Sequence, residues 1–110
     1  MIDWSRVNQL RDEVGADEFD EVVELFLEEV EDVIATLAQG PDLLQLEQNL
    51  HFLKGSALSL GFSVFSNLCQ TGERLSSEGH AEAVDVAEII QAFHASKTVF
   101  MTELPQRLAA

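Results

Sequence analysis

Apolar residues recur every three or four positions along most of the chain, which is the spacing of a helix that buries one face. No segment shows the strict alternation of apolar and polar residues that is typical of a strand. The pattern is interrupted at Gly15, at Gly40 with Pro41, at Gly61 and at Gly79. Glycine and proline commonly end helices or form turns. The pattern therefore predicts a short helix followed by four long ones.

The first two segments are expected to be the short helix and a long one. We expect Asp3 to cap a first helix that ends near Val14. We expect Asp17 to cap the second helix, and Gly40 to end it. Apolar residues at helical spacing predict the buried seams. The first helix has Trp4, Val7, Leu10 and Val14, and the second has Phe19, Val23, Phe26, Val30, Val33 and Leu37.

The remaining three segments also show helical periodicity. Asp42 is expected to open the third helix and Gly61 to end it, and Ser63 is expected to cap the fourth. The last helix is predicted over about 81–104, with Pro105 at or near its end. The predicted seams are Leu46, Leu50, Leu53, Ala57 and Leu60, then Phe65, Leu68, Gly72 and Leu75, then Val86, Ile89, Phe93, Ser96 and Phe100.

These helices predict an all-α fold in one domain over residues 1–110. Short glycine-containing links join the long helices, so neighbours are expected to run in opposite directions. The expected architecture is an up-down antiparallel four-helix bundle with a short extra N-terminal helix. The single cysteine, Cys69, lies in the predicted fourth helix, and we expect it to be a buried small hydrophobe.

The charge excludes several classes of function. The formal net charge is −14, with only six Lys and Arg residues. Nucleic acids and anionic membrane surfaces both require a basic patch. No apolar run approaches the roughly 20 residues of a membrane span, and the N-terminus does not resemble a signal peptide. We therefore expect a cytoplasmic monomer that binds neither nucleic acid nor membranes.

The stretch from His51 to Gly61 carries the most informative chemistry. Lys54 is the only Lys or Arg between Glu13 and Glu73. At about 100° per residue, His51 lies roughly 140° from the centre of the core seam and is expected to point outward. The residues expected around it are Leu44, Glu47, Lys54, Gly55 and Leu58.

Two features near His51 suggest that a second protein docks there. Gly55 in mid-helix costs about 1 kcal/mol relative to alanine, and Leu44 and Leu58 place apolar area on an outward face. A docked partner would bury the leucines and use the clearance at Gly55. The alternatives remain open at this point: a simple surface histidine, a glycine needed for helix packing, and leucines covered by the first helix.

The residues His51-Phe52-Leu53-Lys54-Gly55-Ser56-Ala57, followed by Leu60-Gly61, resemble the signature of the histidine-containing phosphotransfer (HPt) domain. The resemblance extends over essentially the whole chain. It includes Leu25-Phe26-Leu27-Glu28-Glu29, the Leu68-Cys69 pair, Glu73 and the Asp3-Trp4 opening. Two positions depart from the family pattern: Leu50, where a smaller residue is common, and Gly72, where a larger apolar residue is usual.

The resemblance implies a phosphorelay intermediate. Kinase activity of its own is not expected, because the chain has no glycine-rich nucleotide loop or separate ATP-binding domain. His51 would accept a phosphoryl group on Nε2 from the aspartyl phosphate of a receiver domain or from a histidine kinase. It would pass the group to the aspartate of another receiver. Imidazole suits this role because it titrates near neutral pH.

The resemblance also implies roles for the residues around His51. Lys54 would offset charge on the phosphoryl oxygens, Gly55 would let the receiver approach, and Ser56 would orient the imidazole through a hydrogen bond. Docking would involve Leu44, Glu47, Leu58 and Glu73, and Glu73 is also a candidate for holding or repelling the phosphoryl group. No cofactor or metal is expected on this chain, because magnesium would belong to the receiver.

Two other classes of function fit these residues less well. A pure interaction module would bind receivers without carrying phosphate, but it would need neither the nucleophile nor Lys54. A metal-binding bundle would place Glu-x-x-His pairs inward, whereas Glu47 and His51 are four apart and are expected to point outward. His80 and His94 lack the neighbouring Lys-Gly pair and are not expected to carry phosphate.

Overall fold

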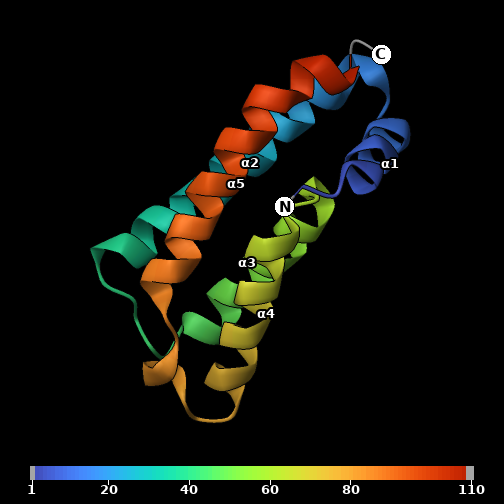
Figure 1. The fold of residues 1–110 in the computed structure, drawn as a ribbon. Helices are drawn as coiled ribbons and strands as arrows, with labels where there is room; N and C mark the ends of the chain where they lie inside the picture. Colours follow the sequence, from blue (N-terminus) through green and yellow to red (C-terminus); the bar gives the residue numbers. More distant parts are fainter. Residues whose placement is uncertain (1, 109–110) are drawn as a thin grey trace.

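Helices make up almost all of the structure, a computed structural model that describes residues 2–108 (Figure 1). In this part of the chain the only strand-like pairing is an isolated bridge between Ile2 and Phe62. The all-α prediction is confirmed. The elements are α1 (Trp4–Val14), α2 (Ala16–Gln39), α3 (Leu46–Leu60), α4 (Ser63–Ser77), the 3-10 helix η1 (Ala81–Ala83) and α5 (Val86–Leu108).

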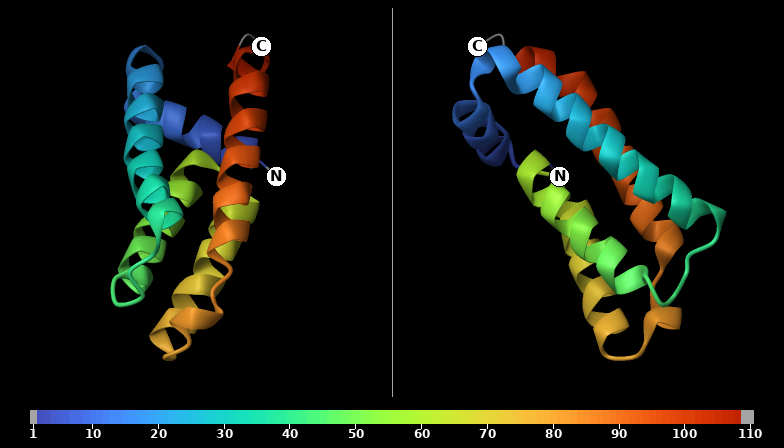
Figure 2. Two further views of the ribbon diagram at one scale, coloured as in Figure 1. Left: turned by 90° about the vertical axis from the view of Figure 1, so that its left-hand side faces the viewer. Right: turned by 180° about the vertical axis from the view of Figure 1, so that it is seen from behind.

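The long helices differ in length, and the ends of the longer pair leave a surface against which α1 packs. Helices α2 and α5 have 24 and 23 residues, whereas α3 and α4 have 15 each. At 1.5 Å per residue the longer pair extends roughly 13 Å beyond the shorter pair. Helix α1 packs against this extension, beyond the end of the α3–α4 hairpin (Figure 2). The Trp4 ring stacks on the Phe100 ring of α5, with centroids 5.8 Å apart.

Hydrogen bonds connect the end of α3 to the residues that begin α1. Gly61 has φ of 75°, and the Phe62 N–H donates to the Ala57 carbonyl at 2.9 Å, as in a Schellman C-cap. The Asp3 N–H donates to the Gly61 carbonyl at 2.7 Å, and the Asp3 side chain accepts from the Arg6 N–H at 3.3 Å. Both the predicted end at Gly61 and the predicted cap at Asp3 are confirmed.

The core lies between α2 and α5 on one side and the α3–α4 hairpin on the other. All five residues of the predicted α3 seam are buried. Phe62 packs edge-on against Phe100, and Phe65 packs against Phe93, with centroid distances of 5.4 Å in both pairs. The α3 seam therefore fixes which side of that helix faces solvent.

The predicted seam of α2 misses two buried residues, and two of its six residues pack at the edge of the core. Leu27 and Ile34 are buried, whereas Phe26 and Val33 are only partly buried. Helix α2 packs against α5 on one side and against α1 and α3 on the other. A helix with neighbours on both sides buries a wider face than a single line of residues at alternating steps of four and three predicts. In α4, similarly, Cys69 and Ser66 are buried while Leu68 and Leu75 are partly exposed.

Three of the predicted helix starts are also wrong. Helix α2 begins after Gly15, so Asp17 lies in its first turn. Asp42 does not open α3: it forms a turn in which its carboxylate accepts from the Leu44 N–H at 3.0 Å, and α3 begins at Leu46. Ser63 is the first residue of α4, after an N-cap at Phe62.

The last helix also differs from its prediction. Residues Ala81–Ala83 form η1, and α5 begins at Val86. Asp85 precedes this helix, and its carboxylate accepts a hydrogen bond from the Glu88 N–H at 3.0 Å. Pro105 lies in the final turn, one turn inside the helix end. No helix within residues 2–108 has the length and apolarity to cross a membrane.

Candidate functional site

His51 projects from the solvent side of α3, as its position relative to the seam predicts. Its side chain is 71% exposed, while Leu50 and Leu53 on the same helix are fully buried. An exposed imidazole is accessible to a second protein without any rearrangement of the bundle.

A carboxylate from the next helix holds the imidazole by one nitrogen. Nδ1 of His51 lies 2.6 Å from Oε2 of Glu73 in α4. An ionised carboxylate only accepts hydrogen bonds, so the Nδ1 atom carries the proton in this pair. In the neutral ring, Nε2 is then unprotonated and is the nucleophilic atom.

The same carboxylate also holds Lys54. The ammonium nitrogen lies 2.6 Å from Oε1 of Glu73, and the two side chains are 25% and 18% exposed. Hydrogen bonding by Lys54, and to a smaller extent by His51, holds the pKa of the Glu73 carboxyl below its ordinary value against the effect of burial. Glu73 is therefore ionised at neutral pH and links the nucleophile to the cation.

Gly55 has no packing role inside the molecule. A Cβ at this position would meet no heavy atom within 4 Å outside its own helix. The alternative that Gly55 serves close packing between helices is therefore wrong. The missing side chain leaves space only on the outer surface of α3, one turn from His51.

Ser56 does not hold the imidazole. Its side chain is 6% exposed, and within the described part of the chain it forms no hydrogen bond with His51. Five positions along a helix correspond to a rotation of about 140°, which carries Ser56 away from the histidine. The predicted orienting bond from Ser56 is replaced by the one from Glu73.

Three of the four predicted docking residues, Leu44, Glu47 and Leu58, are exposed, whereas Glu73 lies on α4 and its side chain is only 18% exposed. Leu58 is 55% exposed and Leu44 is 94% exposed, so α1 covers neither side chain. Leu44 was expected on α3, but it lies in the preceding turn, because the helix begins at Leu46. Glu47 is exposed one turn before His51. Phe52, 38% exposed beside His51, adds apolar area that the sequence analysis did not assign to docking.

A polar hollow borders the site between α3 and α4. It is lined by Glu47, Lys54, Asn67, Gln70, Thr71, Glu73, Arg74 and Ser77. Sequence analysis missed the α4 residues other than Glu73. Their spacing of three and four positions along α4 is a helical stripe that could have identified them.

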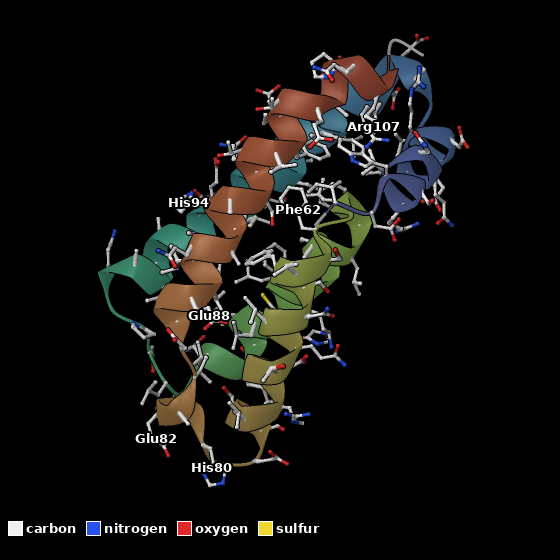
Figure 3. The ribbon with its side chains drawn as sticks, in the orientation of Figure 1. Phe62, His80, Glu82, Glu88, His94 and Arg107 are labelled. Atoms are coloured by element: carbon white, nitrogen blue, oxygen red, sulfur yellow. The ribbon has the colours of Figure 1, made fainter. Side chains whose placement is uncertain are left out.

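Cys69, His80 and His94 are not members of this group. Burial, followed by the charge of Glu73, raises the pKa of the Cys69 thiol to about 12, so it remains protonated as the predicted buried hydrophobe. His80 lies in the turn after α4, and His94 lies on α5 (Figure 3). Lys97 follows His94 at the spacing seen for Lys54 after His51, but no glycine follows it and it pairs with Glu31 instead.

No group of three or more His, Cys, Asp and Glu side chains in residues 2–108 is arranged to hold a metal ion. The site is instead a three-residue arrangement in which one carboxylate joins a histidine to a lysine. Such an arrangement is suited to receiving an anionic group on Nε2.

Comparisons with known proteins identify the family of the chain. A family model described as the Hpt domain matches residues 21–110. The phosphorelay protein LuxU of Vibrio vulnificus, from strains YJ016 and CMCP6, is 26% identical over 107 residues, which are 93% of this chain and 93% of that protein. The phosphorelay intermediate protein YPD1 of Candida albicans is 33% identical over 88 residues, which are 73% of this chain and 45% of that protein. No solved structure gives a significant match.

The family match covers most of the chain, including the helices that carry His51, Lys54 and Glu73. It confirms the family that the stretch from His51 to Gly61 resembles. This chain belongs to the Hpt domain family.

Proposed function

We propose that His51 is the phosphoryl-carrying residue of a phosphorelay intermediate. Nε2 attacks the phosphorus of a receiver's aspartyl phosphate or of a kinase's phosphohistidine. A P–N bond forms, and the donor keeps the electron pair of the broken bond. The reverse step delivers the group to the aspartate of another receiver. The observation that carries this proposal is the hydrogen bond from Nδ1 to Glu73, which leaves Nε2 unprotonated and exposed.

Glu73 supports the step electrostatically. Formation of the P–N bond places positive charge on the imidazole ring while the proton stays on Nδ1. A carboxylate at 2.6 Å stabilises that cation and keeps the ring oriented. No proton has to move, because Nε2 carries none at the start.

Lys54 supplies the positive charge that faces the transferred group. An ammonium group has three donors, and within residues 2–108 only one is engaged, by Oε1 of Glu73. The others are free to bind phosphoryl oxygens without loss of the ion pair. Preorganised cations of this kind are the main source of rate enhancement in phosphoryl transfer.

The receiver is expected to dock over α3. Gly55 leaves space for its backbone, and Leu58 and Phe52 offer apolar contacts. Leu44 and Glu47 flank this surface. The magnesium ion that receiver chemistry uses would be supplied by the receiver, and the carrier has no kinase activity of its own. Action as a monomer and a cytoplasmic location remain predictions from the sequence.

The runner-up is a module that binds receivers without carrying phosphate. Label transfer distinguishes the two. The protein is incubated with a receiver domain that carries ³²P on its aspartate, and wild type is compared with His51→Gln. His94→Gln is a matched control, because His94 has the same spacing to a lysine. Acid-labile label is expected on wild type and the control, and none on His51→Gln. Label on His51→Gln would refute the proposal, and binding without labelling of wild type would favour the runner-up.

A further inference from the structure

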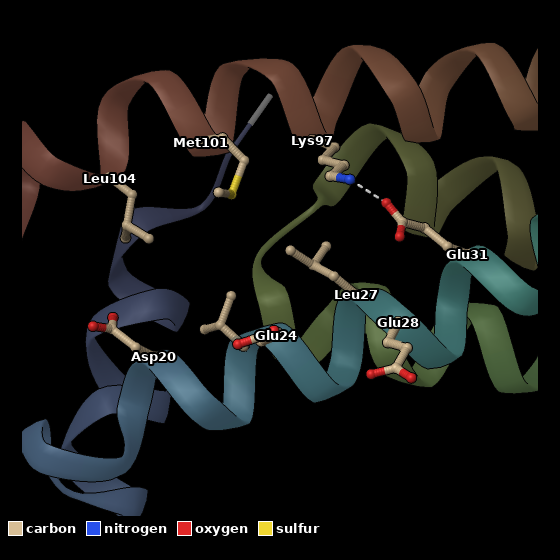
Figure 4. A pocket seen from close by; sticks show the side chains of 9 residues that line it. Asp20, Glu24, Leu27, Glu28, Glu31, Lys97, Met101 and Leu104 are labelled. Carbon is tan, nitrogen blue, oxygen red and sulfur yellow. Dashed lines mark hydrogen bonds and ion pairs between the residues drawn. The ribbon is translucent and has the colours of Figure 1, made fainter.

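A groove runs along the outer seam between α2 and α5, away from the residues of the phosphotransfer site. Figure 4 shows its two walls: Asp20, Glu24, Leu27, Glu28 and Glu31 come from α2, and Lys97, Met101 and Leu104 come from α5. Val23 completes the lining. None of these residues belongs to α3 or α4, so the phosphorelay chemistry does not account for them.

The groove has an apolar floor and one exposed apolar anchor point. Val23, Leu27 and Leu104 lie at its base and are largely buried. Met101 is 51% exposed on the α5 side. Methionine is a flexible side chain that adapts to apolar groups of different shape. The floor therefore suits one or two apolar side chains from a partner.

The α2 wall is a row of carboxylates without matching cations. Asp20, Glu24 and Glu28 follow one another at four-residue spacing, where like charges repel across a helix turn. Within residues 2–108 none of these three forms an ion pair. Lys97 is the only cation that lines the groove, and Glu31 already pairs with it. Repulsion within the row would be relieved by a cationic partner.

We propose that this groove binds a basic amphipathic helix of a partner protein. A helix with Lys or Arg at four-residue spacing would match the carboxylate row, and its apolar face would rest on Met101 and the floor. Helix-in-groove recognition uses this combination of apolar anchors and flanking charges. A second copy of this chain would not fit, because its surface carries the same excess of negative charge. No residue that lines the groove belongs to the site around His51, so this partner is expected to bind without using His51.

A synthetic peptide tests the proposal on the full-length chain. The probe is a fluorescein-labelled peptide of two Lys-Leu-Ala-Lys-Lys-Leu-Ala repeats, and its control is a scrambled peptide of the same composition. Fluorescence anisotropy gives the affinity of each protein variant, and ¹⁵N chemical shifts locate the peptide. Glu24→Gln with Glu28→Gln removes two wall charges. Glu18→Gln with Glu29→Gln removes two exposed charges of α2 that do not line the groove.

The expected result is an affinity about tenfold weaker for the wall pair, from the loss of two partly shielded ion pairs, and little change for the control pair. Met101→Ser is expected to weaken binding, whereas Leu25→Ser, an exposed leucine outside the groove, is not. Shifts should cluster in 20–31 and 97–104. His51→Gln should bind the peptide like wild type, so the result is independent of the proposed relay function.

Three outcomes would overturn the proposal. Equal weakening by both charge pairs would show general attraction to an acidic protein. Equal affinity for the amphipathic and the scrambled peptide would show that the groove does not recognise an amphipathic helix. Sedimentation that shows a dimer of the free chain, abolished by Met101→Ser, would assign the groove to a second copy.

Discussion

Leu50 occupies the space that a side chain at position 72 would need. A Cβ on Gly72 would lie 2.7 Å from Cδ1 of Leu50 and 3.1 Å from Cγ1 of Val84. These are the two positions where the sequence departs from the family pattern, one with a larger residue and one with a smaller residue. Leu50 of α3 and Gly72 of α4 therefore fit against each other where the helices that carry His51 and Glu73 pack together.

The first prediction is that Leu50 and Gly72 are energetically coupled. Gly72→Leu should destabilise the protein by about 1–3 kcal/mol through overpacking. Leu50→Ala should cost about 2–5 kcal/mol through the cavity that it leaves. The double variant should lose less stability than the sum, by roughly 1 kcal/mol or more. Urea unfolding of the four proteins measures this, and strictly additive losses would show that the two sites do not share this space.

Gly55 should separate stability from function. Gly55→Ala should raise the free energy of unfolding by about 0.5–1 kcal/mol, because nothing surrounds the new methyl group and alanine favours helices. Gly55→Leu should slow phosphoryl transfer from a receiver by hindering its approach. Gln48→Ala, at another exposed position of α3, is the control for the helix effect. Transfer that proceeds at the wild-type rate in Gly55→Leu would refute the docking role of this glycine.

Glu73 should determine the tautomer of His51. In Glu73→Ala the imidazole loses its fixed partner, and ¹⁵N NMR should show a mixture of tautomers in place of the Nδ1–H form. Phosphoryl transfer should slow by roughly 10- to 100-fold, which is the range for losing a hydrogen bond to a charged group. Glu78→Ala, an exposed carboxylate of the turn that follows α4, serves for comparison. An unchanged tautomer would remove Glu73 from the mechanism.

Lys54 should contribute to transfer more than to folding. Lys54→Ala should slow transfer by roughly 100-fold, as the removal of one charge-stabilising donor does in other active sites. The melting temperature should fall only modestly, because Lys54 is not part of the buried α3 seam and its loss removes one partly exposed ion pair with Glu73. Lys97→Ala removes another lysine that is paired with a glutamate and should transfer normally. Equal rates for both variants would contradict the assignment.

The stability contributed by Glu73 should depend on pH with a definite sign. The pKa of its carboxyl is lowered in the folded protein, chiefly by Lys54. The unfolded chain therefore binds the proton more readily, and stability from this group is present above the ordinary pKa and is lost as the pH falls below about 4. The difference in unfolding free energy between wild type and Glu73→Gln should shrink over that range. A constant difference would mean that the ion pair adds nothing to stability.

Much of the fold and the centre of the site could be predicted from the sequence. The α3 seam was predicted without error, because a short helix with one buried face follows the simple helical repeat. The outward direction of His51 followed from that seam. Leu27 and Ile34 were missed because α2 has neighbours on two sides, which local spacing does not reveal. Leu44 was misplaced because the Asp42 turn delays the start of α3.

The pairing of His51 with Glu73 was beyond the reach of local patterns. It depends on the register of α4 against α3, which is determined by contacts far apart in the sequence. The same holds for the fit of Leu50 against Gly72. Ser56 was expected to orient the imidazole because it lies within the motif. Its rotation around α3 carries it toward the bundle interior instead.

The hydrogen bond from Asp3 to Gly61 gives the start of the chain an influence on the reactive helix. A Cβ on Gly61 would lie 2.5 Å from the Asp3 carbonyl oxygen, so the backbone at Asp3 packs directly against the backbone at the end of α3. Arg6 adds a hydrogen bond from its Nε to the Leu58 carbonyl at 3.3 Å. The N-terminal segment thus acts as a clamp on the helix that presents His51. If these hydrogen bonds were lost, amide exchange in the final turn of α3 should become faster. A fusion that disturbs the first residues should therefore loosen the docking surface on α3, although it lies outside that surface.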